Sequence, residues 1–319
     1  MKEGAASQTV PVDRPVLLAG STGTIGRAVA QCLVDDGYDL VRLVRRAQTG
    51  QSAALGREVV QDIADAGALQ RQFEAIRPKA VISCIASRSG APKDAWAVDH
   101  DANANLLAAA EAVGVEHFIL LSAICVQKPR LAFQHAKLAF ESKLIESSVE
   151  HTLVRPTAFF KSLSGQIERV RKGKPFMVFG NGELTRCKPI SDRDCARFIV
   201  DCLGLPNRRG AILPIGGPGP AITMREQGAL LFDALGREPH FRSVPVRMFS
   251  AFAGVLGLAE HWSDWAAEKA EYARIARYYA TESMLVWDGE RAEYSADATP
   301  EFGSDTLRDH YARLLVETP

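Results

Sequence analysis

The first half of the chain alternates short, continuous apolar runs with stretches in which apolar residues recur at helical spacing. Pro15–Ala19 is an apolar run, Ile25–Asp35 has helical spacing, and Tyr38–Val44 is a second apolar run. This opening predicts a strand, a helix and a strand. The alternation continues with apolar runs at 80–85, 117–121 and 151–154 and with helical spacing at about 101–113 and 133–147. Strands that alternate with helices predict a parallel sheet covered on both faces.

The pattern changes after Pro156. Phe176–Gly182 predicts a strand that enters a turn, and Ser191 predicts the cap of a helix that runs to Leu203. A strand over Ala211–Ile215 and a helix from Met224 to about Leu235 are expected next. These elements predict a smaller and more mixed unit than the first half.

The predicted fold class is therefore α/β, with a Rossmann-type doubly wound parallel sheet and a smaller mixed C-terminal substrate cap. The expected division is a flexible tail over 1–14, an NADP-binding Rossmann domain over 15–160, and a substrate-binding cap over 161–319 that is interleaved with the Rossmann core. Met248–Ala259 is strongly apolar but much shorter than the roughly 20 residues that cross a bilayer. It predicts either a buried helix or the wall of a hydrophobic pocket.

Composition removes several classes of function. Lysine plus arginine and aspartate plus glutamate number 38 each, so no net field favours nucleic acid as a partner, and a small or flat ligand is expected. The six cysteines form no C-x-x-C pair, which predicts reduced thiols in the cytosol and no bound metal. Residues 1–14 lack both a signal-peptide core and an arginine-rich transit-peptide bias.

A glycine-rich loop joins the first predicted strand to the first predicted helix. Gly20, Gly23 and Gly26 have the spacing and the strand–turn–helix context of a dinucleotide-binding fingerprint. Glycine there turns the chain, admits the pyrophosphate and lets the helix pack on the sheet, while phosphate sits on the helix amides. An ordinary glycine-rich turn is the alternative. The residues predicted to bind the cofactor here are Gly20, Ser21, Thr22, Gly23, Thr24, Ile25 and Gly26.

The end of the second predicted strand favours NADP over NAD. NAD-specific sites usually place an acid there for the ribose hydroxyls, whereas this chain has Arg45 and Arg46. A guanidinium suits the additional 2′-phosphate of NADP, although two arginines could also simply decorate a solvated loop. Loops after the next two strands are further candidates for the cofactor, and they contain Asp62, Ile63, Ala86 and Ser87.

At the catalytic positions the chain resembles the short-chain dehydrogenase/reductase superfamily, in its atypical branch. Ordinary members carry a serine after the fifth strand and Tyr-x-x-x-Lys on the next helix. This chain has Ser122 and Lys137, but Phe133 stands where the tyrosine would be. Lys137 and Ser122 are therefore the candidate catalytic residues, and Lys137 would also hold the ribose.

The absence of that tyrosine restricts the chemistry. Reduction of a ketone puts charge on oxygen and requires a positioned acid, which Phe133 cannot supply. Hydride addition to a vinyl group conjugated to a large π-system spreads the charge, so a weaker or more distant donor suffices. The residues thus favour reduction of a carbon–carbon double bond, or no catalysis at all.

Several long strings resemble the divinyl chlorophyllide a 8-vinyl-reductase family over nearly the whole chain from Pro15 onward. They are Leu120–Pro129, Val154–Leu163, Cys187–Ser191, Leu213–Gly219 and Arg277–Met284. The resemblance implies NADPH-dependent reduction of the 8-vinyl group of divinyl chlorophyllide or protochlorophyllide to ethyl, in chlorophyll or bacteriochlorophyll synthesis. The family also lacks the active-site tyrosine.

The same resemblance implies a set of residues around the cofactor and the substrate. Those assigned to the cofactor are Pro156, Thr157, Ala158 and Phe159. Those assigned to the tetrapyrrole substrate are Cys125, Phe159, Phe160, Lys161 and Trp262, since the two phenylalanines would stack on the flat ring and Lys161 or Arg155 would receive a carboxylate.

Two alternatives stay open from the sequence: a non-catalytic NADP-binding regulator or assembly subunit, and an ene-reductase of the isoflavone-reductase type. The short N-terminus suggests a bacterial protein in the cytoplasm, either free or peripheral to the photosynthetic membrane. The sequence gives no indication of the oligomeric state.

Overall fold

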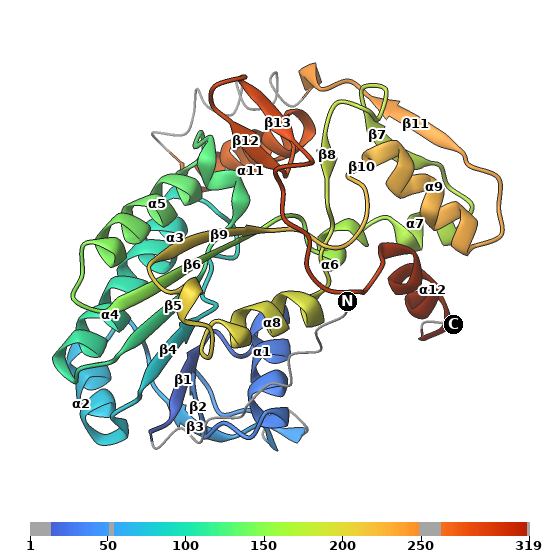
Figure 1. Cartoon of the computed structure of the whole chain (residues 1–319). Coiled ribbons are helices and arrows are strands. Elements are labelled where there is room, and N and C mark those ends of the chain that lie inside the picture. The colour runs from blue at the N-terminus through green and yellow to red at the C-terminus, as the bar shows by residue number, and fades with distance from the viewer. Residues whose placement is uncertain (1–13, 51–53, 249–262, 318–319) are drawn as a thin grey trace.

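The computed structural model describes residues 14–50, 54–248 and 263–317, and Figure 1 shows their arrangement. Seven parallel strands form one sheet in the order β3-β2-β1-β4-β5-β6-β9. The strands are β1 (Val16–Ala19), β2 (Leu40–Val44), β3 (Arg57–Val60), β4 (Ala80–Ser83), β5 (His117–Leu121), β6 (Glu150–Pro156) and β9 (Ala211–Ile215). This order is that of a doubly wound dinucleotide-binding sheet, so the predicted fold class is confirmed.

Helices cover both faces of the sheet, and alternate residues of each strand point to opposite layers. Val16 and Leu18 of β1 pack toward one layer, while Leu17 and Ala19 pack toward the other. The first layer contains α1 (Thr24–Asp35) and α8 (Asp192–Asp201); the second contains α2 (Ala66–Ile76), α4 (Asn103–Ala112) and α5 (Ala132–Ile145). Because both faces of the central strands are buried, β1 and β4 are almost entirely apolar, which explains the uninterrupted apolar runs in the sequence.

Within the described residues, the cap contains three two-stranded sheets and several helices. β7 (Phe176–Phe179) pairs with β11 (Phe241–Val244), β8 (Arg186–Cys187) with β10 (Ile222–Thr223), and β12 (Val286–Asp288) with β13 (Glu293–Ser295). Its helices are α6 (Phe160–Leu163), α7 (Ile167–Arg171), α9 (Met224–Ala234), α11 (Asp264–Thr281) and α12 (Leu307–Glu317). A separate apolar core that includes Phe160, Phe176, Leu231 and Tyr311 holds much of the cap together. The chain enters the cap where β6 ends (Figure 1).

Two elements that follow Pro156 in the sequence, β9 and α8, lie with the large sheet and its helices and not in the cap. β9 pairs with β6 along Thr152–Pro156, and the apolar face of α8 packs against α1. The chain therefore leaves the sheet after β6, forms part of the cap, and returns, which is how the two units interleave.

The helix expected from about residue 101 starts earlier. It begins with α3 (Pro92–Ala95) and passes through the π-helical turn η2 (Trp96–Ala102) before α4. The Asn103 side chain donates to the carbonyl oxygens of Val98 and Asp99, both at 3.2 Å, and so satisfies backbone groups where the helix widens. The described chain also contains the short 3-10 turns η3 (Ile124–Gln127) and η4 (Pro206–Arg208).

The described helices include none that is both long and apolar enough to span a bilayer. The apolar stretch Met248–Ala259 lies outside the described residues beyond Met248.

Candidate active site

The glycine loop after β1 approaches neighbouring backbone too closely for any side chain. Gly20 has φ +82°, and a Cβ built there would lie 2.6 Å from the carbonyl carbon and oxygen of Cys84. A Cβ on Gly26 would lie 2.1 Å from the carbonyl oxygen of Gly20. Both positions therefore require glycine. Thr22 is exposed on the loop and Ile25 is buried below it, so the loop presents bare backbone to a ligand.

The amino end of α1 has the chemistry of a phosphate site. Gly23 precedes the helix without a side-chain cap, and the first turn contains no acidic residue. Lys161 reaches this end from α6, where its Nζ donates to Thr24 Oγ1 at 2.7 Å. The Ser21 hydroxyl oxygen is buried and has no hydrogen-bond partner among the described residues. A positive helix end, a lysine and a buried hydroxyl together fit a pyrophosphate.

Arg45 and Arg46 follow β2 directly and are both exposed. Burial would raise the pKa of the Asp94 carboxyl, but hydrogen bonds from Ser89 and Arg88 lower it, and the nearby Arg45 contributes to the same lowering. The guanidinium groups of Arg45 and Arg46 form no ion pair within the described part of the chain. Both are thus available to a phosphate at this edge of the sheet.

The other predicted cofactor residues lie in loops after β3 and β4. Asp62 is exposed, and its Oδ1 accepts a hydrogen bond from the Ala64 amide at 3.0 Å. Ile63 packs against the sheet core and Ala86 is exposed. The Ser87 amide donates to Asp99 Oδ1 at 3.3 Å.

Lys137 is held by a buried carboxylate. Its Nζ lies 2.9 Å from Asp99 Oδ1, and the side chains are 10% and 0% exposed. Ser122, at the end of β5, has a buried hydroxyl oxygen without a hydrogen-bond partner in the described chain. A ligand hydroxyl could satisfy that oxygen, which is consistent with a ribose or nicotinamide at this edge.

Phe133 packs against the cap. A Cβ on Gly90 would lie 3.4 Å from Phe133 Cδ1 and 2.9 Å from Ile275 Cδ1, so the two side chains converge at this glycine. The position that carries a tyrosine in ordinary dehydrogenases therefore has an apolar contact with α11.

A cavity of about 460 Å³ lies between the carboxyl ends of β5 and β6 and the cap. Its volume is within the roughly 300–1,000 Å³ usual for small-molecule sites. The sheet contributes Ala123–Cys125 and Pro156–Phe159. The cap contributes side chains that include Leu163, Phe179, Cys187, Ile222, Met224 and Met284. The lining is mostly apolar, as binding of a flat hydrophobic ring requires.

Not all the residues predicted to bind substrate reach this cavity. Cys125 and Phe159 line it. Phe160 is 2% exposed in the cap core, with its ring 5.3 Å from that of His310, and Lys161 is at the phosphate end of α1. Trp262 lies outside the described residues.

The cavity also contains residues to which the sequence assigned no role. Arg186 comes from β8, while Tyr279 and Glu282 come from the end of α11. Tyr279 and Glu282 belong to one of the strings that carry the family resemblance, and Arg186 immediately precedes another. The sequence therefore marked these segments as characteristic, but it did not indicate that they line the cavity.

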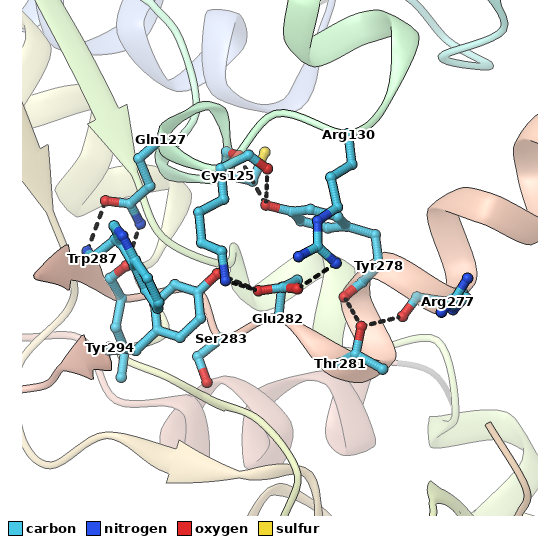
Figure 2. A network of polar contacts seen from close by, with 12 residues as sticks. Cys125, Gln127, Arg130, Arg277, Tyr278, Thr281, Glu282, Ser283, Trp287 and Tyr294 are labelled. Atoms are coloured by element: carbon cyan, nitrogen blue, oxygen red, sulfur yellow. Dashed lines mark hydrogen bonds and ion pairs between the residues drawn. The ribbon is translucent and has the colours of Figure 1, made fainter. Parts of the chain in front are cut away.

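A polar network fixes the end of α11 against η3, the turn after β5. Figure 2 shows Glu282 between Arg130 and Tyr294; its carboxylate accepts from Lys128 at 2.8 Å, Arg130 at 3.0 Å and Tyr294 at 2.7 Å. Burial alone would raise the pKa of Glu282, but these partners lower it, so the carboxylate is charged.

The neighbouring Tyr278 ties the same two segments through the backbone. Its hydroxyl donates to the carbonyl oxygens of Cys125 at 2.9 Å and Lys128 at 3.1 Å (Figure 2). These contacts set the position of the cavity wall.

A family model for NAD(P)H-binding proteins matches residues 20–206. The divinyl chlorophyllide a 8-vinyl-reductase of Arabidopsis thaliana is 44% identical to this chain, over 96% of the chain and 78% of the relative. A photosystem II assembly factor, Ycf39 of Guillardia theta, is 26% identical over 94% of the chain and 95% of the relative. The Escherichia coli NADPH-dependent quinone oxidoreductase, solved with NADPH, superposes with a TM-score of 0.68 at 18% identity, covering 94% of this chain and 99% of the other.

Proposed function

This chain belongs to the divinyl chlorophyllide a 8-vinyl-reductase family, and on that premise we propose how its residues reduce the 8-vinyl group of divinyl chlorophyllide in chlorophyll biosynthesis. The observation that carries the proposal is the apolar cavity at the carboxyl ends of β5 and β6, beside a glycine loop that admits a dinucleotide. Members of this family are NAD(P)H-dependent oxidoreductases, and the NAD(P)H-binding family model covers the glycine loop.

NADPH is the proposed reductant, in preference to NADH. Arg45 is the first candidate for the 2′-phosphate and Arg46 the second, because both are exposed without an ion pair in the described chain. Gly20–Gly26 would hold the pyrophosphate, assisted by Lys161. Bound NADPH supplies the hydride.

Ser122 and Lys137 are proposed to position the ribose and nicotinamide. The buried Ser122 hydroxyl lacks a partner in the described chain, and Asp99 fixes the Lys137 ammonium through the 2.9 Å ion pair. The loops containing Asp62, Ile63, Ala86 and Ser87 are proposed to border the rest of the cofactor, and Pro156–Phe159 to separate it from the substrate.

The substrate ring is proposed to lie in the cavity against Phe159 and Cys125. Among the described residues, Arg186 is the cation that lines this cavity, so it replaces Lys161 and Arg155 as our candidate for the substrate carboxylate. Arg155 is ion-paired with the buried Glu141, and Lys161 is at the nucleotide loop.

In domain terms, we propose that residues 15–160 together with α8 and β9 bind the nucleotide, and that the remaining C-terminal elements bind the substrate. The plant relatives are chloroplastic; for this chain, a cytoplasmic location, free or peripheral to the photosynthetic membrane, stays a proposal.

The test is to incubate the purified chain with NADPH and divinyl chlorophyllide and to record absorption spectra. Loss of a conjugated vinyl group shifts the Soret band to shorter wavelength, and NADPH absorbance should fall in step. Parallel reactions with NADH and with divinyl protochlorophyllide determine cofactor and substrate preference. NADPH binding without oxidation in the presence of substrate would contradict the proposal and indicate a non-catalytic NADP-binding subunit.

A further inference from the structure

Tyr279 brings a phenol to the cavity from α11. The tyrosine of ordinary dehydrogenases lies instead on the helix after the fifth strand, where this chain has Phe133. The Tyr279 side chain borders the cavity, and its hydroxyl and the Cys125 thiol are close enough to interact. Ile275, one helical turn earlier, is the α11 residue that meets Phe133. Residues four apart lie on the same face of a helix, so the face of α11 that covers the missing tyrosine position carries a tyrosine one turn further on.

The position of this phenol is fixed by its neighbours. Tyr278 is hydrogen-bonded to the backbone of Cys125 and Lys128, and Glu282 binds Lys128, Arg130 and Tyr294 (Figure 2). Tyr279 lies between these two anchors on the same helix end. It is thereby held beside Cys125, three residues after Ser122.

Other polar side chains of the cavity are poor proton donors. Gln166 is engaged with the backbone of Met177 at 2.7 and 2.9 Å, and the Thr157 hydroxyl donates to a carbonyl oxygen. Glu282 is a charged carboxylate. Aliphatic hydroxyls are much weaker acids than a phenol.

We propose that Tyr279 is the catalytic acid of the vinyl reduction, an inference that rests on the proposed function. Hydride from NADPH forms a C–H bond at one vinyl carbon as the vinyl π bond breaks. The negative charge that this leaves at the other vinyl carbon is delocalised over the conjugated ring. The Tyr279 O–H bond then breaks and its proton forms the second C–H bond. NADPH is oxidised to NADP⁺, the vinyl group is reduced to ethyl, and the tyrosinate takes a proton from solvent.

The protonation state of Tyr279 is consistent with this role. Burial of its hydroxyl end, followed by the proximity of Cys125, raises its pKa above the ordinary value, so the phenol is protonated at neutral pH. Its side chain borders the cavity, so the tyrosinate takes its proton back from the cavity side.

The experiment compares Tyr279→Phe with Tyr272→Phe, which removes an exposed hydroxyl from the same helix. General acids contribute on the order of 10²–10⁴-fold in rate, so kcat of Tyr279→Phe should fall by at least about 100-fold. The KM for divinyl chlorophyllide, the NADPH dissociation constant from fluorescence and the melting temperature should stay near wild type. Tyr272→Phe should match wild type in all four.

A second variant separates proton donation from a structural role. Tyr279→Ala leaves space for a small ring, so added phenol should restore turnover in proportion to its concentration, whereas toluene, which has the same shape without an acid, should not. Equal rescue by toluene, or unchanged kcat in Tyr279→Phe, would overturn the assignment of Tyr279. Failure of the wild-type protein to reduce the vinyl group would instead overturn the proposed function.

Discussion

Removal of Lys137 alone should destabilise the protein for a reason unrelated to catalysis. Asp99 is fully buried, and its Oδ1 contacts Lys137 Nζ at 2.9 Å. Its other carboxylate oxygen is buried without a hydrogen-bond partner among the described residues. Lys137→Met keeps the length of the side chain but leaves Asp99 with an uncompensated buried charge.

The cost can be estimated from buried ion pairs in general. Removing one partner of such a pair costs about 3–5 kcal/mol. At a urea slope of about 3 kcal/mol/M, this is a fall of about 1–2 M in the unfolding midpoint. Asp99→Asn added to Lys137→Met removes the orphaned charge and retains an oxygen for the Ser87 amide. The double variant should therefore recover more than half of the lost stability.

The assay is urea unfolding followed by circular dichroism, with kcat and the NADPH dissociation constant measured on the same preparations. The double variant should be folded yet reduce the vinyl group at least about 100-fold more slowly than wild type, if Lys137 acts at the cofactor. A Lys137→Met protein as stable as wild type would refute the buried-pair argument. Wild-type turnover in the double variant would remove Lys137 from the mechanism.

Three further predictions concern the cofactor and pH. Arg45→Ala should raise the KM for NADPH by about tenfold or more without changing that for NADH, and a larger effect in Arg46→Ala would reassign the 2′-phosphate. Gly26→Ala should abolish NADPH binding because its Cβ would meet Gly20 at 2.1 Å, whereas Gly204→Ala, with no atom within 4 Å, should bind normally in the same titration. Burial lowers the pKa of His117 to about 4 from 6.5, so the unfolded state binds the proton first as pH falls. The contribution of His117 to the free energy of unfolding is constant above about pH 6.5 and falls by about 3 kcal/mol toward pH 4. Urea unfolding of wild type and His117→Gln between about pH 4 and 7 tests this, and a difference in free energy that does not change with pH would refute it.

The sequence by itself determined the sheet and the nucleotide loop. Strands buried on both faces are predominantly apolar, as in Val16–Ala19, so the pattern identifies a parallel sheet locally. Gly20 and Gly26 are required by backbone geometry that no other residue tolerates. The substitution of Phe133 for tyrosine was equally visible, and with it the restriction on the chemistry.

Only the tertiary structure decided which groups meet. Tyr278 and Cys125 are 153 positions apart, yet they share a hydrogen bond that sets Tyr279 in the cavity wall. The partnership of Asp99 with Lys137, the return of β9 to the sheet, and the orientation of Phe160 away from the cavity were likewise absent from the local pattern. Periodicity indicates whether a residue is buried. Its contact partner depends on how segments distant in the sequence pack together, and a short stretch of sequence does not specify that packing.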